Sequence, residues 1–139
     1  MKHGCVILAD VHHQMLEATR GLLDTKFQTV VMVSSYESLL EASVKIRPEL
    51  IVADLSLPSA DGRKLLIKID KQLGKFKMIV LGKYNETDIV GSIMKTGVRG
   101  YVLKRSTATD LVIAVDKVMI GETYVSPLVL SDVKQNRVE

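Results

Sequence analysis

Short apolar runs alternate with longer segments of helical period along the chain, and this alternation restricts the fold more than any other feature. A strand that is buried on both faces is apolar at successive positions, as the strands of parallel sheets are. The alternation therefore predicts an α/β fold in which helices cover a five-stranded parallel sheet. The expected strands are residues 5–10, 29–34, 50–54, 78–81 and 100–103.

Capping residues predict where the intervening helices begin. Ser34 or Ser35 can cap the second helix, and Asp61 stands before the third. Thr107 with Asp110 resembles a capping box for the fifth helix. The residues expected to end the second to fifth helices are Pro48, Gly74, Gly97 and Gly121.

Size and composition indicate one folded domain. The chain has 139 residues, of which 47% are hydrophobic and 25% charged, so it is too apolar to be disordered. Its one cysteine, Cys5, lies in an apolar run and is expected to be a buried thiol. No apolar run is long enough to span a bilayer, so we expect a cytoplasmic protein with no membrane contact. Residues 1–121 form the expected domain, and residues 122–139 a short C-terminal helix from Leu128 and the start of a linker.

Basic residues are densest between Arg63 and Lys77, where six of them stand against Asp70 alone. Such spacing usually marks the solvated face of a helix. A nucleic-acid surface would be expected to interleave aromatic side chains for base stacking, and Phe76 stands alone in this stretch. We therefore interpret the stretch as a helix surface.

Charged side chains follow three of the expected strands. Asp10 follows the first, Asp54 the third and Lys104 the fifth. The carboxyl ends of parallel strands meet at one edge of the sheet, where the functional crevice of such folds lies. Two carboxylates and one ammonium should therefore converge there. A carboxylate beside a lysine and a divalent cation can attack phosphorus, and Asp54, central in the sheet, is the best candidate nucleophile.

Four segments together resemble the receiver domains of two-component response regulators, especially those that precede a LuxR/NarL-type helix-turn-helix domain. The resemblance extends from Val6 to Pro127 and implies the flavodoxin-like, doubly wound (βα)5 receiver fold. The segments are Ile-Leu-Ala-Asp10, Pro-Glu-Leu-Ile-Val-Ala-Asp54-Leu-Ser-Leu-Pro58 with Asp61-Gly62, Gly97-Val-Arg-Gly-Tyr-Val-Leu-Lys104, and Gly121-Glu-Thr-Tyr-Val-Ser-Pro127.

The resemblance implies a phosphoprotein of a phosphorelay rather than an enzyme. Asp54 would accept a phosphoryl group from a histidine kinase, and Lys104 would contact that group. Asp10, Asp54 and the backbone carbonyl of Ser56 would hold Mg²⁺, and Tyr101 would occupy the aromatic switch position. The output would be transcription regulation, with DNA binding only through a domain that follows the linker and is absent from this chain.

Two positions depart from the family's pattern. Val11 stands where the second acid of the metal-binding pair is usual, and valine offers no oxygen, so we expect weak Mg²⁺ binding. Gly82 stands where a threonine or serine usually donates a hydrogen bond to the phosphoryl group, and glycine has no side-chain donor. The link between phosphorylation and Tyr101 is therefore expected to be weak or absent.

Two other functions are open to this sequence. The first is a phosphorylation-independent pseudo-receiver that acts as a dimerisation or docking module. With either function, residues 110–120 carry more apolar residues than one buried stripe requires and are a candidate homodimer surface. The second is a small enzyme or cofactor binder of the same topology, but the loop after Asp10 has no dinucleotide or phosphate-loop glycine motif. His12 matches a histidine common in the subfamily, so we do not expect it to be a metal ligand. A metal site of Asp10, His12 and His13 is disfavoured, because adjacent histidines point to different faces of a helix.

Overall fold

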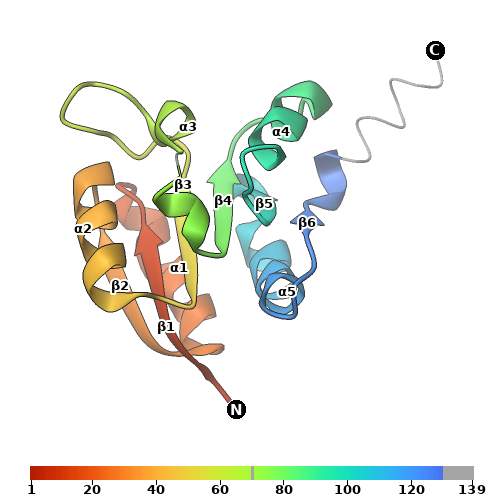
Figure 1. Cartoon of the computed structure of the whole chain (residues 1–139). Coiled ribbons are helices and arrows are strands. Elements are labelled where there is room, and N and C mark those ends of the chain that lie inside the picture. Colours follow the sequence, from red (N-terminus) through yellow and green to blue (C-terminus); the bar gives the residue numbers. More distant parts are fainter. Residues whose placement is uncertain (70, 130–139) are drawn as a thin grey trace.

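The computed structural model describes residues 1–69 and 71–129, and its centre is a parallel sheet (Figure 1). The strand order is β2-β1-β3-β4-β5-β6, which contains the flavodoxin-like order 2-1-3-4-5. The expected α/β class and parallel pairing are confirmed. The strands are β1 (His3–Ala9), β2 (Phe27–Val33), β3 (Leu50–Asp54), β4 (Met78–Gly82), β5 (Gly100–Leu103) and β6 (Tyr124–Val125).

Helices pack on both faces of the sheet and give it two separate apolar layers. Residues of α1 and α5 pack with one cluster of buried strand residues, and residues of α2, α3 and α4 with the other (Figure 1). The helices are α1 (His13–Asp24), α2 (Tyr36–Ile46), α3 (Leu65–Lys68), α4 (Thr87–Met94) and α5 (Thr107–Met119), with short 3₁₀ turns η1 (Leu73–Lys75) and η2 (Lys104–Ser106).

The three central strands β3, β4 and β5 are buried at every residue. This double-sided burial explains why their sequences are apolar without alternation. Truncating a fully buried strand leucine such as Leu8 to alanine would cost about 2–5 kcal/mol. The rigid centre therefore holds the strand ends in fixed positions.

The capping predictions have mixed outcomes. Ser35 caps α2, since its hydroxyl accepts a hydrogen bond from the backbone N–H of Ser38. The capping box of α5 is wrong: Thr107 lies inside the helix, and its hydroxyl donates to the carbonyl of Lys104 instead. Asp61 does not cap α3 either, because its carboxylate accepts from the backbone N–H of Arg63, before the helix begins.

The third helix is much shorter than predicted. It was expected to continue to Gly74, but α3 ends at Lys68 because the backbone of Ile69 is extended, with ψ of 111°. Leu65 and Leu73 are both fully buried on either side of this break. Packing of these two side chains against the sheet thus outweighs the local preference for a continuous helix.

A sixth strand, which the sequence analysis did not predict, extends the sheet beyond β5. Tyr124 and Val125 pair in parallel with Gly100 and Tyr101. The buried hydroxyl of Ser126 accepts from the backbone N–H of Leu103 at 2.9 Å. Helical residues follow from position 127 to 129, and the remainder of the expected C-terminal helix and linker lies outside the described residues.

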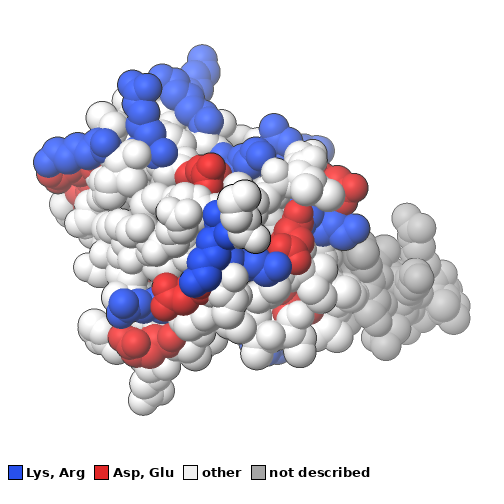
Figure 2. Space-filling view, turned by 90° about the horizontal axis from the view of Figure 1, so that it is seen from below, with Lys and Arg blue, Asp and Glu red and all other residues white. Residues whose placement is uncertain are grey.

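Three further expectations concern the surface and the thiol. In the described part of the chain, no helix combines the length and hydropathy needed to cross a bilayer. Figure 2 shows basic and acidic side chains interspersed on the face seen from below, rather than one uniformly basic patch. Cys5 is partly buried, and burial raises the pKa of its thiol. A raised pKa leaves little thiolate at neutral pH, which fits a structural cysteine.

Candidate functional site

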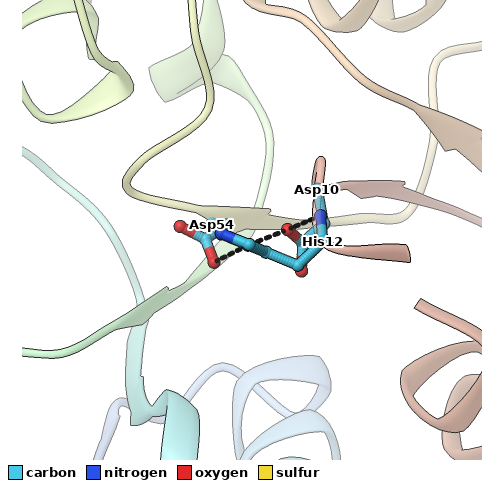
Figure 3. A group of neighbouring side chains, drawn as sticks. All are labelled: Asp10, His12 and Asp54. Atoms are coloured by element: carbon cyan, nitrogen blue, oxygen red, sulfur yellow. Dashed lines mark hydrogen bonds and ion pairs between the residues drawn. The ribbon is translucent and has the colours of Figure 1, made fainter. Parts of the chain in front are cut away.

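Two buried carboxylates lie at the point where the strand order reverses. Asp10 directly follows β1 and is 1% exposed, and Asp54 ends β3 and is 3% exposed. β1 and β3 are neighbours, with Ala9 paired to Ala53, so the next residues come side by side (Figure 3). Open α/β sheets bind ligands at such a switch point. The apolar strands therefore place both acids in the functional crevice.

The ammonium of Lys104 lies between the two carboxylates. Lys104 follows β5, and its Nζ is 3.2 Å from Oδ2 of Asp10 and hydrogen-bonds Oδ2 of Asp54. The structure thus brings together the two acids and the lysine that the sequence analysis selected. One positive charge against two negative charges leaves the cluster with a net negative charge that suits a cation.

Asp54 also accepts hydrogen bonds from Ser56. The backbone N–H and the hydroxyl of Ser56 both donate to Oδ1 of Asp54, at 2.7 and 2.5 Å. Burial of Asp54 opposes ionisation, but the hydrogen bonds from Lys104 and Ser56 outweigh it and lower the pKa of Asp54 below its usual value. Asp54 is therefore a charged carboxylate at neutral pH.

His12 belongs to the cluster, although the sequence analysis set it aside. Its Nδ1 is 2.9 Å from Oδ1 of Asp10, 3.6 Å from Oδ2 of Asp54 and 2.5 Å from Nζ of Lys104. Figure 3 shows the imidazole between the two carboxylates. The sequence signal for its place in the cluster is its position two residues after Asp10. His13 begins α1 and is exposed, so the alternative site with both histidines is not formed.

The donor set fits a divalent cation only in part. Asp10, His12 and Asp54 each offer one ligand atom, and these atoms all lie within 4.8 Å of one another. Mg²⁺ prefers oxygen ligands in a near-octahedral shell, and the two carboxylates supply them. Val11 instead packs against the apolar cluster on the α2 side of the sheet. The position therefore contributes to the core and offers no third carboxylate.

Gly82 and Tyr101 form a close contact at the neighbouring strand ends. A Cβ at Gly82 would lie 2.5 Å from Oη of Tyr101 and 2.9 Å from Cδ1 of Leu55. Tyr101 is fully buried, and its hydroxyl donates to the carbonyl of Tyr84 at 2.7 Å. Burial raises the pKa of Tyr101 to about 12. The tyrosine ring thus occupies space that any side chain at position 82 would need.

Comparison with known proteins agrees with this geometry. The family model of the response regulator receiver domain matches residues 6–116. The transcriptional regulatory protein DegU of Brevibacillus brevis is 27% identical over 126 residues, covering 89% of this chain and 53% of the relative. The oxygen regulatory protein NreC of Staphylococcus epidermidis is 33% identical over 94 residues, covering 67% of this chain and 41% of the relative. The chain thus spans about half the length of these relatives.

Solved structures share the fold. A structure of the RcsB response regulator of Salmonella typhimurium superposes with a TM-score of 0.83 at 25% identity, covering 94% of this chain and 67% of that one. A LuxR-family two-component response regulator from Aurantimonas has a TM-score of 0.81 at 22% identity, covering 97% of this chain and 98% of that one, and supports the fold alone. These relatives are LuxR/NarL-type regulators, as the motifs suggested. The chain belongs to the response regulator receiver domain family.

Proposed function

We propose that this receiver domain accepts a phosphoryl group on Asp54 from a histidine kinase. The observation that carries the proposal is the state of Asp54: a buried, ionised carboxylate held between Lys104 and Ser56 at the switch point of the sheet. An oxygen of Asp54 forms the new O–P bond as the P–N bond of the donor phosphohistidine breaks. The electron pair of that bond stays on the imidazole nitrogen of the donor.

Lys104 stabilises the charge that develops on the phosphoryl oxygens. Its ammonium already contacts Asp54, so it needs little reorganisation when the phosphoryl group arrives. Asp10 and Asp54, with the carbonyl of Ser56, would hold Mg²⁺, which supplies further neutralisation of phosphoryl charge when bound. Lys104 contacts oxygens of both acids, so it competes with the cation for them. Together with Val11, this competition supports weak Mg²⁺ binding.

The output proposed for the phosphorylated state is control of transcription. The supporting observation is that the matched relatives include longer transcriptional regulatory proteins, of which the match to this chain covers 53% and 64%. One RcsB structure contains dimers bound to DNA. For this chain, we propose homodimerisation through α5, where Ile113 is 48% exposed and Ile120, just after the helix, is 73% exposed.

A phosphorylation-independent interaction module is the second candidate. The specific observation in its favour is that Gly82 has no hydroxyl to contact a phosphoryl group, while the buried ring of Tyr101 fills the space that a side chain there would need. A receiver of this kind would present one constant surface to its partner.

Phosphorylation with a small donor distinguishes the two candidates. The protein is incubated with Mg²⁺ and acetyl phosphate, and intact mass is measured for the wild type, Asp54→Ala and the control Asp61→Ala. Asp61 is exposed and lies outside the carboxylate cluster. A phosphate adduct in the wild type and in Asp61→Ala, but not in Asp54→Ala, supports the receiver function. Absence of an adduct under conditions that label an ordinary receiver would favour the interaction module.

A further inference from the structure

A cavity of about 590 Å³ extends from the carboxylate cluster toward α3 and the loop after β4. His12, Asp54 and Lys104 line one end of it. The part beyond them is lined by Gly62, Arg63, Lys64, Leu66, Ile67, Lys83 and Tyr84, which we call the α3 pocket. Cavities of this volume hold small organic ligands in other proteins, whereas a phosphoryl group on Asp54 would fill only its end.

The charged side chains that line the α3 pocket are all cationic. Arg63, Lys64 and Lys83 line it and form no ion pair with a carboxylate of the described residues. By contrast, the nearby Lys68 pairs with Asp61 at 2.5 Å. Unpaired cations around a concave surface raise the local concentration of anions.

The same pocket has an apolar wall. Leu66 is 37% exposed and Ile67 is 68% exposed, on the short helix α3. The ring of Tyr84 adds an aromatic surface, with the ammonium of Lys83 5.7 Å from its centroid. Exposed aliphatic side chains in a concave site favour a ligand with an apolar body.

Gly82 is part of the cavity lining, where it contributes backbone and no side chain. Ile67 also lines the cavity, one residue before α3 ends at Lys68. Gly82, which departs from the family's pattern, and Ile67, near the unexpectedly early end of α3, thus both border the cavity.

We propose that the α3 pocket binds a small organic anion, with its acidic group held by Arg63, Lys64 and Lys83 and its apolar body against Leu66 and Ile67. Such a ligand covers the approach to Asp54. The pocket thus provides a second input to the domain that requires neither magnesium nor a phosphodonor.

Binding of anilinonaphthalene sulfonate, a fluorescent organic anion with an apolar body, tests this site. Fluorescence titration is done without Mg²⁺ or phosphodonor, and we expect saturation at one dye per chain. The double variant Arg63→Ala/Lys83→Ala should raise the Kd about fivefold, as expected for two partly screened contacts. Ile67→Asp should raise it about tenfold, because it removes apolar contact and adds a like charge. Higher salt should also weaken binding.

Matched controls lie on other surfaces of the same protein. Lys95→Ala removes an exposed lysine outside the pocket, and Val44→Asp alters a side chain that is 67% exposed on α2. Both should leave the Kd unchanged. Equal dye binding in all variants, no saturable binding, or a loss only in Val44→Asp would overturn the proposal. Asp54→Ala should bind the dye at least as tightly as the wild type, so the result does not depend on phosphorylation.

Discussion

The ends of β1 and β3 differ in kind from the contact between β4 and β5. The first region, which we call the charged edge, presents Asp10 and Asp54 to Lys104, so charge decides its chemistry. The second region, which we call the packed edge, places Gly82 against the buried ring of Tyr101, so packing decides its conformation. Of the features that the family resemblance implies, the aspartate proposed as acceptor is present, and the hydroxyl that would connect it to the tyrosine is missing. We therefore propose that phosphoryl acceptance on Asp54 and its relay through Tyr101 are separable in this domain.

The largest effect is expected from removing the cation at the charged edge. Lys104→Met removes the lysine that pairs with two buried carboxylates, and at neutral pH and without Mg²⁺ we expect a loss of about 3 kcal/mol in the free energy of unfolding. Urea denaturation measures it, with Lys95→Met as the exposed control. Because the variant frees both carboxylates, added Mg²⁺ should restore much of the loss. A variant as stable as the control would show that the ion pairs contribute little.

At the packed edge, Gly82→Ala should destabilise the fold by about 2 kcal/mol, as overpacking does. The added Cβ would lie 2.5 Å from Oη of Tyr101, so that the ring must move. Gly91→Ala is the matched control, since a Cβ there meets nothing within 4 Å. Combining Gly82→Ala with Tyr101→Ala should cost less than the sum of the single changes. If the destabilising effects of the two single changes simply add in the double variant, the proposed contact is contradicted.

A smaller effect, about tenfold in Mg²⁺ affinity or about 1.4 kcal/mol, is expected from Val11→Asp. The change adds a carboxylate next to Asp10 and makes the cluster more negative. Calorimetric titration with Mg²⁺ measures the affinity, and His13→Asp is the control because it adds the same charge outside the cluster. Similar gains in both variants would mean that general charge, rather than a ligand at position 11, sets the affinity.

A last effect is expected only at alkaline pH and concerns the packed edge. The pKa of Tyr101 is about 12 in the folded state and near 10 in an unfolded chain. Above about pH 10 the unfolded state releases this proton while the folded state keeps it, so stability falls as pH rises toward 12. Tyr101→Phe should show a weaker alkaline loss in thermal unfolding. Equal pH dependence in both proteins would argue against a buried, protonated Tyr101.

Much of the charged edge could be predicted from the sequence. A strand buried on both faces is an apolar run, so the first charged residue after it marks the strand's end, as Asp10 and Lys104 do. The third helix could not be predicted in this way. Its residues have helical period, but burial of Leu65 and Leu73 on either side of Ile69 requires an extended link between them. The predicted capping box of Thr107 was wrong because its hydroxyl donates to the carbonyl of Lys104 in the preceding turn.

The sequence by itself determined the parallel sheet, the receiver family and the meeting of Asp10, Asp54 and Lys104, because apolar runs define strands and parallel strands end at one edge. Only the tertiary structure decided the position of His12, the sixth strand, the contact of Tyr101 with Gly82 and the cavity beside α3. Each of these depends on distances between segments far apart in the chain, which packing sets and local residue patterns do not encode.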